Sequence, residues 1–180
     1  MVYKIALDLE GTIADIHTTF SKKIIESYRV NFSVEDINAW NWGEKVKSLG
    51  LSIQDCLDIR KNIWLQELES IPFTDETVRE TIYVLTKKYK VDIVTAIEKE
   101  AEDSARNWLS HNSINHLNLV FHNDKEELDY DLFIDDKPSL ASKLPYDKLI
   151  VYDRPWNRYL NSQRVYQLEE VVKKIDEQEI

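Results

Sequence analysis

The feature that most constrains the fold is an alternation of short apolar runs with helical segments after residue 72. Runs expected to form strands lie at 3–7, 91–95, 117–121, 132–134 and 149–152. Segments expected to form helices lie at 74–89, 100–110 and 168–175, where apolar residues recur at helical spacing. Strands that alternate with helices indicate βα crossovers and therefore a parallel sheet. The sequence predicts an α/β fold.

The segment 17–71 departs from this alternation. Phe20, Ile24 and Tyr28 recur at the spacing of a helix, and Ser33 and Ser52, each three residues before an Asp, are typical of helix starts. The segment is too long for an ordinary loop. Because open α/β sheets bind ligands at the carboxyl ends of their strands, we interpret it as a helical cap over that edge. The chain would then consist of a core, 1–16 with 72–180, and a cap, 17–71.

Composition excludes several functional classes. The 180 residues include 43% apolar ones, enough for the core of about one domain. The 33 acidic residues outnumber the 23 basic ones, and a net charge of −10 argues against binding duplex nucleic acid. The apolar N-terminal stretch is interrupted at Asp8, unlike a signal peptide, and no apolar run approaches the roughly 20 residues of a membrane span. Cys56 is the single cysteine, so no intrachain disulfide is possible and we expect a cytoplasmic protein.

Polar residues follow the apolar runs at several predicted strand ends. They are Asp8 and Glu10, Thr95, and Asp135 with Asp136, and Lys125 precedes Asp135 by ten residues. Since the carboxyl ends of parallel strands meet at one edge, these side chains should be neighbours. Grouped carboxylates require a cation, and oxygen ligands suit Mg²⁺. A carboxylate can attack a phosphoryl group while a lysine and a hydroxyl hold its oxygens. The pattern therefore indicates Mg²⁺-dependent phosphoryl chemistry.

These motifs resemble those of haloacid dehalogenase (HAD) phosphatases. The segment 5–12 around Asp8 is similar to their first motif, Thr95 to the second, Lys125 to the third and Asp135-Asp136 to the fourth. The chain resembles more narrowly the cytosolic 5′(3′)-deoxyribonucleotidase-like family. The segments that carry this second resemblance are 11–15, Lys125 with 134–138, and 155–158. The resemblance implies a Rossmann-like parallel sheet with an inserted helical cap, and a 5′-nucleotidase that hydrolyses (deoxy)nucleoside monophosphates through an aspartyl phosphate.

The resemblance also implies roles at the metal. Asp8 would be the nucleophile and a direct Mg²⁺ ligand. Glu10 would offer its backbone carbonyl to the metal and its side chain as general acid and base. Asp136 is our choice for the further direct ligand, with Asp135 in support, because adjacent side chains point in different directions.

The phosphate and the rest of the substrate would contact other residues. Thr95, the backbone N–H of Ala96 and Lys125 would hold the phosphate. The aromatic rings of the segment 17–71 could stack on a nucleobase, and Arg158 could reach the site. The candidates for substrate contacts are thus Trp40, Trp42, Trp64 and Arg158. The histidines share no metal-ligand spacing and are expected on surface turns; they are His17, His111, His116 and His122.

Glu10 is the departure that matters, because the family has Asp at this position. A carboxyl one methylene further out must still lie within hydrogen-bond reach of the proton it transfers. Retained activity, slow turnover, or a non-catalytic phosphate-binding protein remain open. A phosphatase for another small phosphomonoester is a further alternative. A response-regulator receiver domain also combines an acidic pair with an Asp, a Thr and a Lys, but its acidic pair lies early in the chain, whereas Asp135-Asp136 follows the lysine.

Overall fold

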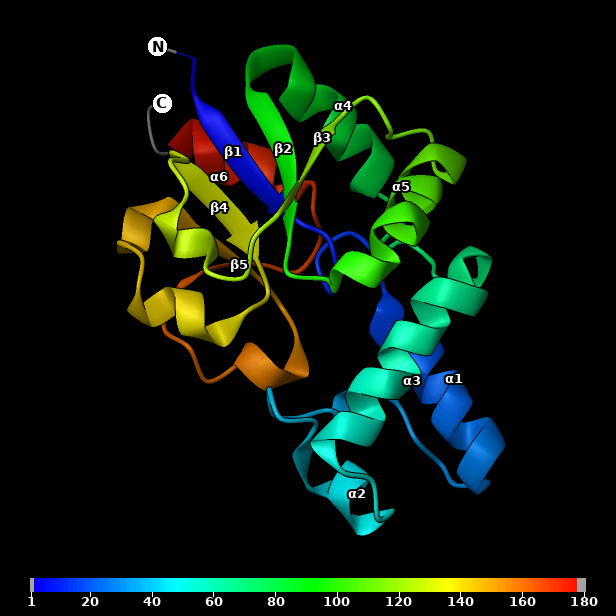
Figure 1. The fold of residues 1–180 in the computed structure, drawn as a ribbon. Coiled ribbons are helices and arrows are strands. Elements are labelled where there is room, and N and C mark those ends of the chain that lie inside the picture. Colours follow the sequence, from blue (N-terminus) through cyan, green and yellow to red (C-terminus); the bar gives the residue numbers. More distant parts are fainter. Residues whose placement is uncertain (1, 178–180) are drawn as a thin grey trace.

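The computed structural model describes residues 2–177 as an α/β fold, which confirms the predicted class (Figure 1). The strands are β1 (Lys4–Asp8), β2 (Lys90–Thr95), β3 (Asn118–Phe121), β4 (Leu132–Asp135), β5 (Leu149–Tyr152) and β6 (Gln163–Val165). The helices are α1 (Ile16–Tyr28), α2 (Gly43–Ser48), α3 (Ile53–Gln66), α4 (Val78–Lys88), α5 (Glu102–His111) and α6 (Glu170–Glu177). Short 3-10 turns connect many of these elements.

The six strands form one parallel sheet in the order β3-β2-β1-β4-β5-β6. The chain runs outward from β1 to one edge through β2 and β3, and then returns to the other side through β4. The order therefore reverses between β1 and β4. In open α/β sheets, ligands bind at the carboxyl ends of the strands beside such a reversal.

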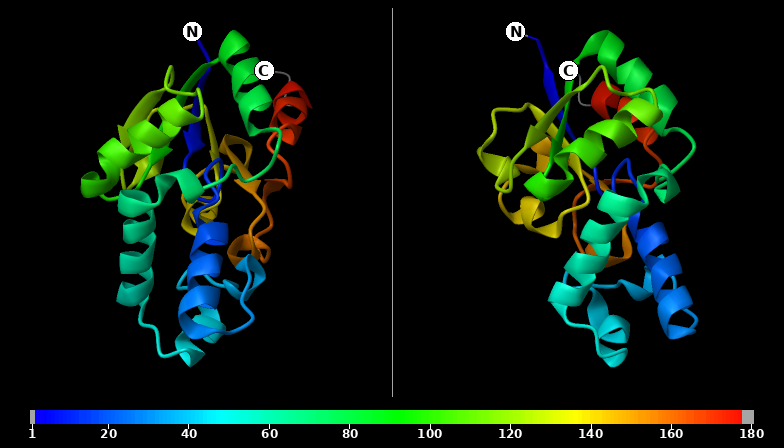
Figure 2. Two further views of the ribbon diagram at one scale, coloured as in Figure 1. Left: turned by 90° about the vertical axis from the view of Figure 1, so that its right-hand side faces the viewer. Right: turned by 45° about the vertical axis from the view of Figure 1, so that its right-hand side comes forward.

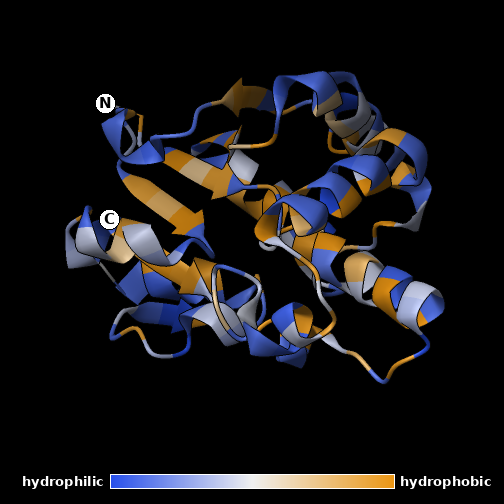
Figure 3. Cartoon of the chain, turned by 60° about the horizontal axis from the view of Figure 1, so that its bottom comes forward, coloured by the Kyte–Doolittle hydropathy of each residue, from blue (hydrophilic) through white to orange (hydrophobic). Residues whose placement is uncertain are grey.

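Both faces of the sheet are covered. In β1, Ile5 and Leu7 face the larger apolar cluster, which includes Ile82 and Leu85 of α4, whereas Ala6 faces a smaller cluster on the other side. In Figure 3 the central strands are coloured mostly as apolar, whereas the helices alternate apolar and polar stretches. Strands buried on both faces read as nearly continuous apolar runs, which is why their positions were recognisable in the sequence.

Helices α1, α2 and α3 lie between β1 and β2 in sequence and beyond the carboxyl ends of the strands in space (Figures 1 and 2). One predicted helix start is present: Ser52 caps α3 and exchanges hydrogen bonds with Asp55. Ser33 precedes only a three-residue 3-10 turn, where its N–H donates to the Asp36 carboxylate and the Asp36 N–H donates to the Ser33 carbonyl.

The two connections to this helical segment run side by side. The Asp15 N–H donates to the carbonyl of Pro72 over 2.8 Å, and the Thr74 N–H donates to the carbonyl of Ile13 over 3.2 Å. Ala14 and Phe73 form an isolated antiparallel bridge between the same two stretches. The segment thus leaves and rejoins the sheet at one place.

Two expectations about elements differ from the structure. The helix expected from residue 74 begins at Val78, because Asp75 accepts hydrogen bonds from the N–H and hydroxyl of Thr77 and holds a turn there. Strand β6 was not predicted, because it has three residues and only Val165 among them is buried and apolar.

Candidate active site

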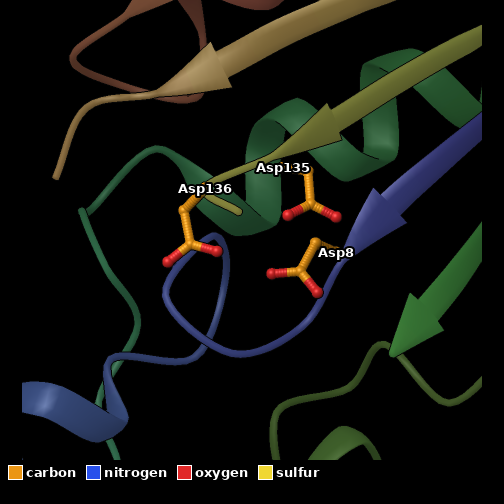
Figure 4. Close-up of side chains that lie close together, drawn as sticks. All are labelled: Asp8, Asp135 and Asp136. Atoms are coloured by element: carbon orange, nitrogen blue, oxygen red, sulfur yellow. The ribbon is translucent and has the colours of Figure 1, made fainter. Parts of the chain in front are cut away.

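Three carboxylates meet at the carboxyl edge of the sheet. Asp8 ends β1, Asp135 ends the neighbouring β4, and Asp136 follows it. Each offers an oxygen within 4.8 Å of the others, and all three residues are buried. Figure 4 shows their carboxylates turned toward one common space. Register in a parallel sheet has therefore gathered residues that lie far apart in the sequence.

Lys125 supplies a positive charge beside this group. Its Nζ donates to Asp8 Oδ1 and, over 2.7 Å, to Asp135 Oδ2. Its side chain is 3% exposed. Burial opposes the charge of the ammonium, but the carboxylates of Asp135 and Asp8 outweigh burial and raise the pKa of Lys125. Lys125 therefore remains charged and links the end of β1 to the end of β4.

One lysine does not balance the carboxylates. Burial, followed by repulsion from Asp135, raises the pKa of Asp8 to about 7, even though Lys125 and Thr12 donate to it. Burial, followed by the charges of Asp8 and Asp135, raises the pKa of Asp136 well above its usual value. Burial and repulsion between the neighbouring carboxylates thus both disfavour their ionised forms, even with Lys125 and Arg154 close by. A bound cation would relieve this repulsion.

The three carboxylates differ in their hydrogen bonds. Asp135 has both oxygens occupied, by Lys125 and by the Lys137 N–H at 2.8 Å. Among residues 2–177 no side chain or N–H donates to the Asp136 carboxylate, although it is 3% exposed. A carboxylate that lines the cavity and accepts no hydrogen bond fits a metal ligand. The side-chain atoms that could bind a metal here are all carboxylate oxygens, which suit a hard divalent cation such as Mg²⁺.

Glu10 lines the same cavity as these carboxylates and contacts helix α3. Its Oε1 accepts a hydrogen bond of 2.7 Å from Trp64 Nε1, and its Oε2 accepts one of 3.1 Å from Arg60. Arg60 also forms an ion pair with Glu98, which follows β2. The charge of Glu10 raises the pKa of the Arg60 guanidinium, and the charge of Glu98 adds to this effect. Burial acts in the opposite direction but does not outweigh them. Arg60 was not singled out by the sequence reasoning.

A cavity of about 390 Å³ opens beside these groups. Its polar end is lined by Asp8, Glu10, Arg60, Thr95, Ala96, Lys125, Asp135 and Asp136. Its other end is lined mostly by apolar and aromatic residues, including Ile16, His17, Ile37, Trp40, Trp42, Ile53, Leu57 and Trp156. Thr95 is buried at the end of β2, and its hydroxyl accepts a hydrogen bond of 3.2 Å from the Ile97 N–H. The lining therefore combines charged groups with apolar and aromatic side chains.

The structure places two of the four predicted substrate-contact residues in the lining of the cavity. Trp40 and Trp42 line the cavity, whereas Trp64 does not: it is fully buried, and its indole N–H contacts Glu10. Arg158 is also outside the lining, because it pairs with Glu35 and Asp153. Helix periodicity shows that a tryptophan lies on a buried face but not what that face meets.

The expectation that the histidines lie on surface turns is wrong for His17, and His111 also lies in a helix, as the last residue of α5. His17 lies in the first turn of α1, lines the cavity and packs against Trp156 with ring centroids 4.3 Å apart. Its Nδ1 is buried and has no hydrogen-bond partner in the described part of the chain. Burial, followed by the positive charges of Arg154 and Arg60, lowers the pKa of His17 well below its usual value. His17 thus presents a neutral imidazole to the cavity.

Solved structures share this fold over nearly their whole length. A HAD-like hydrolase from Streptococcus pneumoniae aligns with a TM-score of 0.65 at 13% sequence identity, covering 97% of this chain and 98% of that one. A HAD-like protein of unknown function from Agrobacterium tumefaciens gives 0.66 at 10% identity and covers both chains completely. A HAD family hydrolase from Deinococcus radiodurans with bound phosphate and sodium gives 0.63 at 11%, with 98% and 96% covered. The fold is that of the HAD superfamily.

The family can be stated more narrowly. The model of the family described as 5′ nucleotidase, deoxy (pyrimidine), cytosolic type C protein matches residues 1–178, so the chain belongs to that family. It is an enzyme of the phosphatase and nucleotidase class, and the receiver-domain alternative is excluded. No curated protein sequence matches the chain significantly. Within residues 2–177, no helix is both long and apolar enough to cross a membrane.

Proposed function

We propose that the chain is a Mg²⁺-dependent phosphomonoester hydrolase that acts on (deoxy)nucleoside monophosphates through an aspartyl phosphate on Asp8. The observation that carries the proposal is the buried group of Asp8, Asp135 and Asp136, which has Lys125 as its bridging cation and a carboxylate without a donor. The family match supports a nucleotide as the substrate. We also propose the cytosolic location that the family description names.

In the first step, a carboxylate oxygen of Asp8 attacks phosphorus, and the bond from phosphorus to the ester oxygen breaks. Glu10 donates a proton to that oxygen, which leaves as a nucleoside hydroxyl. In the second step, Glu10 accepts a proton from water as the water oxygen attacks phosphorus. The bond from phosphorus to Asp8 then breaks, releasing phosphate and restoring the carboxylate.

The remaining groups hold charge and geometry. Lys125 would neutralise the charge of the phosphoryl oxygens. The Thr95 hydroxyl and the N–H of Ala96 would donate hydrogen bonds to them. Mg²⁺ would be held by the carboxylates of Asp8 and Asp136 and by the Glu10 carbonyl, with Asp135 orienting Lys125; when bound, it offsets the charge that develops on the phosphoryl oxygens.

The apolar end of the cavity would take the nucleoside. Trp40 and Trp42 offer aromatic faces, and base stacking on such faces tolerates different bases. We propose that residues 17–71 act as a cap that closes over the substrate and excludes water. The core of 1–16 and 72–180 would then supply the phosphoryl chemistry.

The experiment measures phosphate release from a panel of nucleoside monophosphates and p-nitrophenyl phosphate, with Mg²⁺ or with EDTA. We expect turnover that requires Mg²⁺, that prefers a nucleotide and that Asp8→Asn abolishes. A preference for another phosphomonoester would correct the substrate. Binding of phosphate without turnover in the wild type would favour the non-catalytic alternative, and turnover in EDTA or in Asp8→Asn would refute the mechanism.

A further inference from the structure

Both oxygens of the Glu10 carboxylate are held by one helix. Trp64 Nε1 lies 2.7 Å from Oε1, and an Arg60 nitrogen lies 3.1 Å from Oε2. The two donors are four residues apart on α3 and therefore project from the same face of that helix. The Glu10 side chain is 13% exposed. The orientation of the Glu10 carboxylate is therefore fixed by residues of the segment 17–71, although Glu10 itself follows strand β1.

The Trp64 donor is itself fixed by packing. Trp64 is fully buried and meets Trp108 of α5 edge-on, with ring centroids 6.2 Å apart. Trp108 in turn donates its indole N–H to the Ile71 carbonyl over 2.9 Å. A rigid, buried ring loses little conformational entropy when it donates a hydrogen bond. Trp64 therefore offers a donor at a defined point beside the cavity.

Arg60 is held in a similar way. Its guanidinium lies between Glu10 and Glu98, which come from the loops after β1 and β2. A planar guanidinium with several fixed donors can orient two carboxylates at once. The arrangement joins α3 to both loops at the charged end of the cavity.

These contacts matter because of the length of Glu10. A glutamate has one more rotatable bond than an aspartate, so its carboxylate covers a larger volume when it is free. Proton transfer needs the carboxyl within hydrogen-bond reach of the reacting oxygen, and an error of about 1 Å can cost about a hundredfold in rate. Two donors that fix both oxygens would remove this freedom.

We propose that Trp64 and Arg60 are positioning residues that hold the longer Glu10 side chain for proton transfer, so that α3 must be docked for the reaction to proceed. The inference rests on the function proposed above. Trp64 does not line the cavity, so its effect on turnover passes through Glu10. Arg60 does line it, which makes Trp64 the cleaner residue to test.

The experiment compares Trp64→Phe with Tyr130→Phe in the full chain with Mg²⁺. Each variant removes one buried hydrogen-bond donor and keeps an aromatic ring, but only Trp64 contacts Glu10, whereas the Tyr130 hydroxyl donates to Asp92. We expect kcat for a nucleoside monophosphate to fall at least about tenfold in Trp64→Phe with KM changed less than about twofold. Tyr130→Phe should lose thermal stability with its own hydrogen bond and keep kcat within about twofold.

The variant Glu10→Gln tests whether Trp64 acts on turnover through Glu10. If Trp64 acts only through the Glu10 carboxylate, Trp64→Phe should add no loss of kcat in the Glu10→Gln background, because effects on one shared interaction are not additive. The rate of the first step alone, measured as the initial release of p-nitrophenolate or nucleoside, should also fall less for p-nitrophenyl phosphate than for a nucleotide, since p-nitrophenolate leaves without needing a proton. Equal losses in both backgrounds, or a change in KM alone, would overturn the inference.

Glu10→Asp keeps the test decisive if Trp64→Phe does not fold. The shorter side chain should not reach both donors, and we expect kcat to fall at least about tenfold. An unchanged or higher kcat would show that Glu10 needs no partner from α3. Wild-type turnover that Trp64→Phe leaves intact refutes this inference alone. Absence of wild-type turnover refutes the proposed function, and the inference with it.

Discussion

Gly11 lies against Asp136, and a Cβ atom at position 11 would overlap the Asp136 carboxylate. Gly11 also has a φ of +84°, a conformation that side chains other than glycine rarely adopt. Because Gly11 has no side chain, the turn after β1 can lie directly against Asp136, which follows β4.

The first prediction concerns that approach. Gly11→Ala should displace Asp136 and lower kcat/KM at least about a hundredfold, as expected for a misplacement of about 1 Å. Gly50→Ala is the matched control, because Gly50 has a φ of +78° but no atom within 4 Å of an added Cβ. It should cost about 1 kcal/mol in unfolding free energy and leave kcat unchanged. Equal activity in both variants would contradict the prediction; kinetics and urea unfolding measure it.

The second prediction separates the two adjacent aspartates. Asp136→Asn removes a like charge from a site with excess negative charge, so the metal-free variant should have a higher Tm than the metal-free wild type. It should require much more Mg²⁺ for half-maximal activity. Asp135→Asn should lower Tm, because Lys125 and the Lys137 N–H lose an ionised partner.

Calorimetry in EDTA and activity titrations with Mg²⁺ test this pair. Kinetic effects of about 10–100-fold are expected for a residue that only orients the ligands, as proposed for Asp135. The same Mg²⁺ requirement for both variants would show that the two carboxylates are not distinguished by their hydrogen bonds.

The third prediction concerns pH. The pKa of Asp8 is raised from 3.8 to about 7 in the folded chain, so the folded state binds the proton more tightly than the unfolded state between these values. This contribution to stability is present at low pH and is lost as pH rises toward 7. Mg²⁺ binds the ionised carboxylates, so the increase in Tm on adding Mg²⁺ should be larger at pH 8 than at pH 5.5. An increase independent of pH in thermal shift assays would argue against a metal on Asp8.

The fourth prediction concerns His17. Its pKa is lowered below the usual 6.5, so the unfolded state binds a proton that the folded state does not. The metal-free protein should therefore lose stability from this residue as pH falls below about 6.5. His17→Phe keeps a ring against Trp156 and removes this titration, so the difference in Tm between variant and wild type should shift in favour of the variant from pH 7 to pH 5. A constant difference would mean that His17 takes up a proton equally in the folded and unfolded states, so that folding does not lower its pKa.

The fifth prediction concerns Arg158. Its ion pair with Glu35 joins the loop after β5 to the segment 17–71, but the Arg158 side chain is 50% exposed. Exposed ion pairs contribute about 0–1 kcal/mol. Arg158→Ala should change unfolding free energy by no more than that and leave KM for the preferred substrate within about twofold. A tenfold rise in KM would place Arg158 in contact with substrate after all.

Much of the charged end of the site was predictable, for a geometric reason. Asp8, Thr95 and Asp135 each end a buried strand, and parallel strands bring such ends together whatever the details of packing. Lys125 could be included because its spacing to Asp135 matched a motif, and the structure brings its Nζ to both Asp8 and Asp135. The sheet itself could be predicted from the apolar runs, apart from the three-residue β6.

The side of the site formed by α3 was not predictable in the same way. The sequence shows that Arg60 and Trp64 share a helical face, but the rotation of α3 over the sheet depends on packing with α1 and α5. That rotation decides which side chains line the cavity and which contact Glu10. His17 was missed for a related reason, since a histidine in a first helical turn appears exposed until Trp156, from the distant end of the chain, packs over it.

The paired connections at 13–15 and 72–74 have a consequence for how this chain could change. Because these two connections are hydrogen-bonded to each other, the helices between them could be replaced or shortened without altering the path of the sheet. The group of Asp8, Asp135 and Asp136 would survive such a change, whereas the Glu10 carboxylate would lose both of its partners.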